Sequence, residues 1–146
     1  MIDQVKVFLG LGSNLDGPEF QIKQALIHLS EHTAIQLIQV SSFYHSKPMG
    51  PQDQPDFVNA VCEIRTDLGP YQLMAVTQGI EYKQHRVKTR HWGERTIDID
   101  ILLYGALKLN SPELTIPHPG MLDREFVMQP LLEIVDEEII RKLMAA

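Results

Sequence analysis

Two aspartates near the middle of the chain are the residues best suited to chemistry. Asp98 and Asp100 are separated by one residue within an apolar run, so an extended strand would present both carboxylates on one face. Their Cα atoms would lie roughly 6.5 Å apart. Carboxylates this close repel each other unless a cation lies between them, and Mg²⁺ prefers oxygen ligands that often include substrate phosphates. The pair therefore predicts a metal site.

A short basic segment precedes these aspartates. From Lys83 to Arg95 the chain carries five of its thirteen lysines and arginines, and Glu94 is the single acid there. The whole chain has a net charge of −6, so this segment predicts a local anion site and not a broad basic face. Arginines beside paired carboxylates suit a Mg²⁺–polyphosphate, because cations bind the phosphate oxygens while the acids bind the metal.

The aspartate pattern also fits a plain alternative. An amphipathic strand with a solvated face alternates Ile97, Ile99 and Ile101 with aspartates in the same way, and alternation alone does not separate the two interpretations. Aspartate is depleted in strands, however, and like charges on one strand face are unfavourable. Together with the adjacent basic segment, this favours the metal site.

Composition limits the class of protein. With 146 residues and 44% hydrophobic content, the chain is expected to form one domain over residues 1–146 with a real core. Its acidity argues against nucleic-acid binding. Cys62 is the only cysteine, which excludes an intrachain disulfide and a cysteine-based zinc site. There is no apolar run long enough for a membrane span and no basic signal region. We expect a monomeric cytoplasmic enzyme that does not bind membranes.

Hydrophobic periodicity predicts the elements that must position these residues. In chain order they are a strand over 5–11, a helix over 22–29, strands over 35–43 and 57–65, a helix opened by Gly69-Pro70, a strand over 96–104, a short strand over 107–109, a buried segment over 127–134 and a helix over 137–144. The glycine-rich segment 10–18 lacks both dinucleotide and phosphate-loop signatures. It is better explained as a strand-to-helix turn capped by Asp16.

This order predicts a ferredoxin-like α+β fold, β-α-β-β-α-β, with an antiparallel sheet, helices on one face and small C-terminal additions. The open face would then carry Asp98, Asp100, Phe57 and Asn59 together. An aromatic ring beside an amide can stack on and hydrogen-bond a flat heterocycle, although an ordinary half-exposed pair is the commoner case. The three prolines within Ser46–Asp56 predict an irregular loop suited to binding.

The chain resembles the 6-hydroxymethyl-7,8-dihydropterin pyrophosphokinase family. The most specific likeness is Trp92–Leu102, reading WGERTIDIDIL, and it extends to Gly12-Ser13-Asn14, to 41–44, to 50–60 and to Pro117-His118. The resemblance implies transfer of the β,γ-diphosphoryl group of ATP to the hydroxymethyl group of the pterin, with release of AMP. It also implies that Asp98 and Asp100 hold two Mg²⁺ ions.

The resemblance further implies roles for other residues, according to what each would contact. The residues that would contact the ATP phosphates or close over them are Arg86, Lys88, Arg95, His118 and Arg124. Of these, Arg86 and Arg95 would also take part in catalysis. The nucleotide would lie near Gln78, Glu81, Ile101 and Thr115, under a closing loop that carries Trp92. The pterin pocket would comprise Phe57 and Phe126 around the ring, Asn59 at its polar edge, and Ser46, Pro48, Met49 and Trp92.

Some residues depart from the family pattern, and other functions remain in view. Lys88 stands where many members have arginine, so a point charge replaces a bidentate fork at this residue. Glu113 and Pro119 also differ from the family pattern.

Another Mg²⁺-dependent phosphotransferase or nucleotidyltransferase would share the aspartates and arginines but would not need Phe57, Asn59 and Phe126. A ferredoxin-like RNA-binding module would need a basic field, which this chain lacks.

Overall fold

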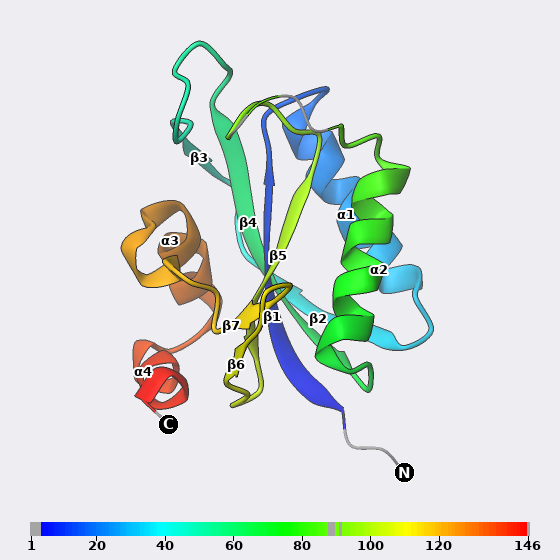
Figure 1. Ribbon diagram of the computed structural model, residues 1–146, viewed down its shortest axis with the longest axis vertical. Coiled ribbons are helices and arrows are strands. Elements are labelled where there is room, and N and C mark those ends of the chain that lie inside the picture. Colours follow the sequence, from blue (N-terminus) through cyan, green and yellow to red (C-terminus); the bar gives the residue numbers. More distant parts are fainter. Residues whose placement is uncertain (1–3, 88–89, 91, 146) are drawn as a thin grey trace.

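A five-stranded antiparallel sheet forms the centre of the molecule (Figure 1). The structure is a computed structural model that describes residues 4–87, 90 and 92–145. The strands are β1 (Val5–Ser13), β2 (Ile35–Val40), β3 (Tyr44–Ser46), β4 (Phe57–Thr66) and β5 (Asp98–Tyr104). Their order is β2-β4-β1-β5, and the short β3 pairs with β4 beyond the end of β2.

Helices α1 (Pro18–Glu31) and α2 (Pro70–Lys83) cover one face of this sheet (Figure 1). Both begin with proline, which lacks the N–H that the first turn would leave unpaired. The core between the layers includes Ile22, Leu29, Leu73 and Ile80, all buried. The β-α-β-β-α-β order and the α+β class predicted from the sequence are confirmed.

The last two helices cover part of the opposite face. α3 (Glu125–Ile134) and α4 (Glu137–Ala145) follow a 3-10 turn, η1 (Met121–Asp123), and lie across the sheet from α1 and α2 (Figure 1). A second buried cluster joins Phe8 and Val61 of the sheet to Met121 and Leu131. The C-terminal additions therefore close half of this face and leave the half near Phe57 and Asp98 for a site.

β5 carries the alternation that places the aspartates. Ile99 and Ile101 are buried in the core beneath α1 and α2, so Asp98 and Asp100 point to the other face. The pairing with β1 then shifts, because Leu9 pairs with Ile101 whereas Phe8 pairs with Leu103. Leu102 is the extra residue of this β-bulge. Leu102 and Leu103 are both buried in the second cluster. β5 therefore carries the aspartates at its start and core leucines directly after the bulge.

Several local expectations were wrong. Asp16 does not cap α1: Gly17 holds the N-cap position with φ 76°, and Asp16 is itself left-handed with φ 56°, whereas a capping side chain needs extended backbone at its own residue. The strand expected over 35–43 ends at Val40, and Tyr44–Ser46 forms a separate strand. The short strand after β5 is β6 (Leu109–Asn110), which pairs with β7 (Thr115–Ile116). Among the described residues, no helix is long and apolar enough to cross a membrane.

Packing of α3 is tested by two adjacent leucines. Leu131 is fully buried and Leu132 is 43% exposed. We expect Leu131→Ala to lower the free energy of unfolding by about 2–5 kcal/mol, because it leaves a cavity against the sheet. Leu132→Ala is the matched control and should cost about 0.5 kcal/mol or less. Urea unfolding measures both, and equal losses would contradict this placement of α3.

Candidate active site

Two glycines of β1 make room above the aspartate pair. Gly10 lies directly opposite Asp100 and Gly12 directly opposite Asp98, and directly opposed residues share a sheet face. No side chain from β1 therefore stands beside the carboxylates. A Cβ on Gly12 would lie 3.3 Å from Asn59 Oδ1. The glycine-rich segment thus contributes to the site by leaving space for the aspartates and for Asn59.

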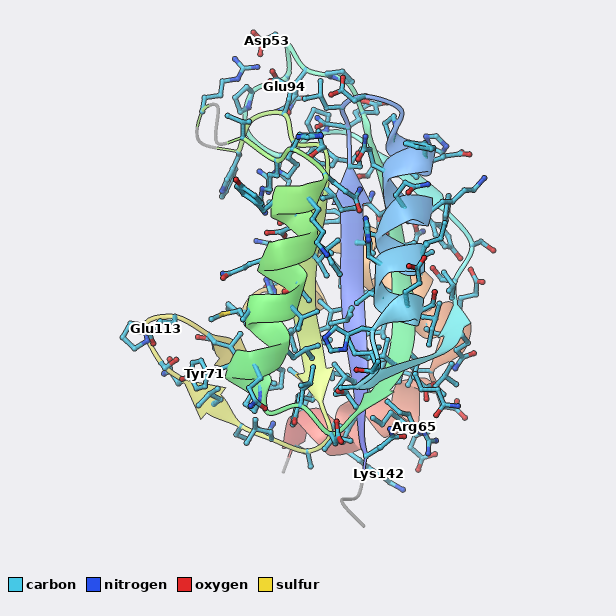
Figure 2. The ribbon with its side chains drawn as sticks, turned by 90° about the vertical axis from the view of Figure 1, so that its right-hand side faces the viewer. Asp53, Arg65, Tyr71, Glu94, Glu113 and Lys142 are labelled. Atoms are coloured by element: carbon cyan, nitrogen blue, oxygen red, sulfur yellow. The ribbon has the colours of Figure 1, made fainter. Side chains whose placement is uncertain are left out.

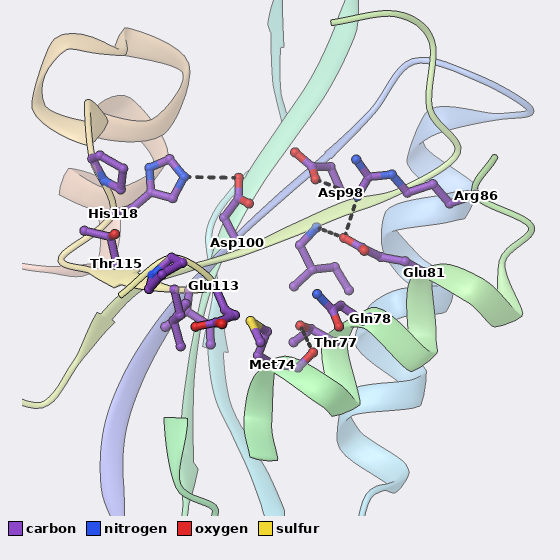
Figure 3. A pocket seen from close by; sticks show the side chains of 15 residues that line it. Met74, Thr77, Gln78, Glu81, Arg86, Asp98, Asp100, Glu113, Thr115 and His118 are labelled. Carbon is purple, nitrogen blue, oxygen red and sulfur yellow. Dashed lines mark hydrogen bonds and ion pairs between the residues drawn. The ribbon is translucent and has the colours of Figure 1, made fainter. Parts of the chain in front are cut away.

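Two adjoining cavities meet at Asp98. The larger cavity, of about 410 Å³, lies between α2, β5 and the β6–β7 hairpin (Figure 3). Its lining residues are Met74, Thr77, Gln78, Glu81, Arg86, Asp98, Ile99, Asp100, Ile101, Pro112, Glu113, Leu114, Thr115, His118 and Pro119. The smaller, about 110 Å³, is lined by Ser46, Lys47, Met49, Phe57, Asn59, Trp92, Arg95, Asp98, Arg124 and Phe126. Asp98 lines both, so molecules bound in the two cavities would meet at this carboxylate.

Arginines hold the Asp98 carboxylate from two sides. Arg86 Nη1 lies 3.0 Å from Asp98 Oδ1, and Arg95 Nη1 lies 3.3 Å from Oδ2. Glu81 accepts a 2.8 Å hydrogen bond from the Ile99 amide and pairs with Arg86 at 2.9 Å. Figure 3 shows Arg86 between Glu81 and Asp98. Burial raises the pKa of Glu81, and the Ile99 amide and Arg86 oppose that shift.

Asp100 lies in a different electrostatic environment from Asp98. Burial, and then repulsion by Asp98 and Glu81, raises the pKa of Asp100 to about 7, against the opposing effect of Arg86 and Arg124. Forty per cent of its side-chain surface remains open to the cavity, so water there offsets part of the burial. His118 Nε2 lies 3.9 Å from Asp100 Oδ2, and burial followed by Arg124 lowers the pKa of His118. Neutral histidine contributes little positive charge, so within the part of the chain that the structure describes Asp100 has no ion pair as close as those of Asp98.

The carboxylate pair fits a magnesium ion that retains other ligands. Among the described residues, no group of three or more His, Cys, Asp or Glu side chains could enclose a metal. Mg²⁺ is commonly bound by one or two carboxylates, with water and substrate phosphates completing its coordination. Burial first, and then repulsion by Asp98 and Glu81, raises the pKa of Asp100, and a cation beside the carboxylate would oppose both effects. Asp98 and Asp100 thus fit Mg²⁺ better than a metal with an all-protein cage.

The smaller cavity brings together the predicted aromatic residues. Phe57 and Phe126 both line it, from β4 and α3. The Arg95 guanidinium lies 5.8 Å from the Phe57 ring centroid, and that of Arg124 lies 6.0 Å from the Phe126 centroid. Asn59 donates a 2.7 Å hydrogen bond to Ser46 Oγ, which orients its amide at the cavity edge. Aromatic rings and an amide are suited to a flat, polar heterocycle.

A buried pair of amides joins the two loops around the site, and sequence reasoning missed it. Asn14 Oδ1 accepts a 3.0 Å hydrogen bond from the Arg95 amide, and Asn14 Nδ2 donates to Gln54 Oε1 at 2.9 Å. Gln54 Nε2 donates to the Trp92 carbonyl at 2.8 Å. At the loop surface Arg90 pairs with Asp53 and Glu94, each at 2.8 Å, and Figure 2 shows these two acids at one end of the molecule. The family likeness covers residues 14 and 54, but asparagine and glutamine in turn-rich segments usually indicate solvated loops, so nothing in the sequence indicated that these two side chains meet.

Nearly all the predicted residues reach one of the two cavities. The larger is lined by Gln78, Glu81, Arg86, Asp98, Asp100, Ile101, Thr115 and His118; the smaller by Ser46, Met49, Phe57, Asn59, Trp92, Arg95, Asp98, Arg124 and Phe126. Pro48 is buried but lines neither cavity, and its carbonyl accepts a hydrogen bond from Gln52. Lys88 lies outside the described residues. Sequence reasoning missed the lining residues Lys47, Met74, Thr77, Pro112 and Leu114, because none of them stood in a pattern that indicated a site.

The fold and site together define a class of enzyme: one that transfers a phosphate-containing group to a flat acceptor beside paired carboxylates. The family model described as 7,8-dihydro-6-hydroxymethylpterin-pyrophosphokinase (HPPK) matches residues 8–136. A Haemophilus influenzae protein named 2-amino-4-hydroxy-6-hydroxymethyldihydropteridine pyrophosphokinase is 49% identical over 136 residues, covering 93% of this chain and 85% of that protein. A Pseudomonas aeruginosa protein of the same name is 43% identical, covering 90% and 82%. The chain belongs to the HPPK family.

Solved structures show the same fold. Plasmodium falciparum HPPK-DHPS with pterin and p-hydroxybenzoate matches with a TM-score of 0.70 at 17% identity over 94% of this chain. HPPK-DHPS A437G with STZ-DHP from the same organism matches with a TM-score of 0.71 at 16% identity over 92%. This chain spans about two fifths of each of those longer chains. At these identities the likeness establishes the α+β fold alone.

The contrast between the two carboxylates predicts opposite effects on stability. A carboxyl whose pKa is higher in the folded than in the unfolded chain makes folding less favourable as pH rises from about 4 to about 7. Without Mg²⁺, Asp100→Asn should therefore stabilise the protein at pH 8 and not at pH 4. Asp98→Asn relieves one repulsion on Asp100 but removes two ion pairs, with Arg86 and Arg95, and the net cost should be about 1 kcal/mol or less at pH 8. Urea unfolding in EDTA measures both, and changes of the same sign at pH 8 would contradict this electrostatic contrast.

Close contact between Gly50 and Trp92 gives a spectroscopic test of the loop arrangement. Gly50 has φ +82°, and a Cβ there would lie 2.9 Å from Trp92 Cβ. We expect Gly50→Ala to displace the only tryptophan and to shift its fluorescence emission. Gly79→Ala is the control, because nothing lies within 4 Å of a Cβ at residue 79, and its emission should match wild type. Unchanged emission in Gly50→Ala would show that the loops do not pack in this way.

Proposed function

We propose that this chain catalyses Mg²⁺-dependent transfer of diphosphate from ATP to the hydroxymethyl group of 6-hydroxymethyl-7,8-dihydropterin, releasing AMP. Family membership supports the reaction, since the relatives carry that activity in their names. The observation that carries the proposal is the position of Asp98, which lines both cavities. A phosphate chain in the larger cavity and an acceptor in the smaller would meet at this carboxylate.

The pterin would occupy the smaller cavity. Its flat ring would lie between Phe57 and Phe126, and the Asn59 amide, oriented by Ser46, would hydrogen-bond the polar edge. Met49 and Trp92 would complete the walls. Fixing the ring in this way would hold the hydroxymethyl oxygen close to Asp98, where positioning itself lowers the barrier.

ATP would occupy the larger cavity. Gln78, Ile101 and Thr115 line its nucleotide end, and Arg86 and His118 line the end near the aspartates (Figure 3). Arg95 and Arg124, from the smaller cavity, would bind phosphate oxygens that cross between the two. Lys88 would add a further phosphate contact. Phosphoryl transfer requires alignment and neutralisation of charge more than a covalent nucleophile, and this set of cations suits that requirement.

Asp98 and Asp100 would hold two Mg²⁺ ions together with phosphate oxygens. When bound, the metal supplies charge neutralisation for an in-line displacement. Arg86 and Arg95 now pair with Asp98, and they would turn from the carboxylate to the phosphates once the metal replaces them. Both arginines would thereby be catalytic, since they contact the group being transferred.

Other expectations remain predictions. We propose a single pyrophosphokinase domain over residues 1–146 that acts as a monomer in the cytoplasm and binds no nucleic acid. A different Mg²⁺-dependent phosphotransferase would explain the larger cavity equally well. It would not explain why Phe57, Phe126 and Asn59 gather at the smaller cavity beside Asp98, so the pterin reaction is favoured.

The nucleotide product tests the proposal directly. Purified protein is incubated with Mg²⁺-ATP and 6-hydroxymethyl-7,8-dihydropterin, and the nucleotides are separated by chromatography. We expect AMP to appear in equal amount with a pterin diphosphate, because two phosphates leave together. Formation of ADP, or no turnover, would contradict the assignment.

The same assay tests the carboxylates. Asp98→Asn and Asp100→Asn should each slow turnover by about 10³-fold or more, because either removes an anionic metal ligand worth several kcal/mol at the transition state. Circular dichroism and the urea midpoint establish that each variant is folded. Turnover within tenfold of wild type in either variant would remove that residue from the metal site.

A further inference from the structure

A carboxylate far from the reacting groups binds α3 to the edge of the sheet. Glu133, in the last turn of α3, accepts three hydrogen bonds from the segment that ends in β3. The donors are the Ser42 amide (2.8 Å), the Ser42 hydroxyl (3.1 Å) and the Tyr44 hydroxyl (2.6 Å). The Tyr44 hydroxyl, and then the Ser42 amide, lower the pKa of Glu133. The glutamate is therefore an anion to which three donors point.

The two elements that Glu133 joins, α3 and β3, each supply a residue that lines the smaller cavity. Phe126 and Glu133 are seven residues apart in α3, so they project from the same side of the helix about 10 Å apart along its axis. On the sheet, Tyr44 pairs with Asn59 and Ser46 pairs with Phe57. β3 is thus held at Tyr44 by Glu133, and two residues later Ser46 pairs with Phe57, which lines the smaller cavity together with Phe126.

α3 needs such an anchor. Pro130 lies inside the helix and supplies no N–H, so the internal hydrogen-bond ladder of α3 lacks one bond. Leu131 holds the helix to the sheet through the second cluster, with other apolar side chains of α3 partly buried beside it, and Gln39 Nε2 donates a 3.3 Å hydrogen bond to the Ile134 carbonyl. That apolar contact is non-directional, and directed hydrogen bonds at a second point would fix the rotation of α3 about it. The rotation determines where Phe126 stands.

We infer that Glu133 is a positioning residue for the pterin pocket, which fixes the distance and angle between Phe126 and the Phe57–Asn59 edge through Ser42 and Tyr44. This inference rests on the proposed function for its ligand. Substitution of Glu133 should change pterin binding and not ATP binding. The reason is that α3 supplies Phe126 to the smaller cavity, whereas no described residue of α3 lines the larger one.

The variant Glu133→Gln is a near-isosteric test. The Gln carbonyl could still accept from the Ser42 amide and hydroxyl, but its NH₂ group can only donate, so the Tyr44 hydroxyl would have to turn from donor to acceptor and the charge assistance to all three bonds would be lost. We expect pterin affinity and the KM for pterin to weaken about five- to tenfold, with the KM for ATP within twofold of wild type. Tyr44→Phe should weaken pterin binding in the same direction, and the double variant should be less than additive. Glu137→Gln is the control, since Glu137 is an exposed carboxylate paired with Arg141 on α4.

A measurement without substrate separates this inference from the proposed function. The protein is labelled with fluorophenylalanine at its five phenylalanines, and the ¹⁹F resonance of Phe126 is assigned with Phe126→Leu. Glu133→Gln and Tyr44→Phe should shift or broaden the Phe126 resonance, and Glu137→Gln should leave it unchanged. If wild type binds no pterin, the proposed function fails while the ¹⁹F spectra still decide the role of Glu133. A lower urea midpoint with an unchanged Phe126 resonance and unchanged pterin affinity would overturn the inference.

Discussion

Repulsion between two carboxylates on one strand face is the constraint around which the structure is arranged. Asp98 and Asp100 are two residues apart on β5, and Glu81 adds a third negative charge nearby. The fold tolerates this because Arg86 and Arg95 pair with Asp98. Asp100 lacks close ion pairs among the described residues, and its pKa rises to about 7. The fold therefore holds a poorly compensated charge at Asp100, at some cost to its own stability.

The same constraint explains the positions of the neighbouring elements. Gly10 and Gly12 face the two aspartates, so the space above them is left for ligands. The arginines come from the loop between α2 and β5 and not from the strand itself, so under the proposed function they could leave Asp98 for phosphate oxygens. Asn14 and Gln54 bind that loop through backbone groups of Arg95 and Trp92. These neutral amides can hold the loop without adding charge to the site.

The sequence predicts the parts of this structure that follow from periodicity. Alternation places Asp98 and Asp100 on one face and their isoleucine neighbours in the core, and the helical pattern with Pro70 predicts α2. The Asp16 cap could not be predicted correctly, because it depends on the backbone conformation of Asp16 and Gly17. The bulge at Leu102, the amide pair and the Glu133 contacts join residues far apart in the chain. Only the folded geometry determines such contacts, whereas the assignment of ATP and pterin roles came from resemblance to the family.

The metal site is tested most directly by locating the ions. Crystals grown with an ATP analogue that cannot be cleaved, with 6-hydroxymethyl-7,8-dihydropterin and with Mn²⁺ in place of Mg²⁺ would give anomalous difference maps. We expect two peaks between the phosphate chain and the aspartates, with carboxylate oxygens of Asp98 and Asp100 at about 2.0–2.2 Å. We also expect Arg86 and Arg95 to have moved from Asp98 to phosphate oxygens. A metal bound by phosphates alone, with both arginines still paired to Asp98, would contradict the proposed metal site.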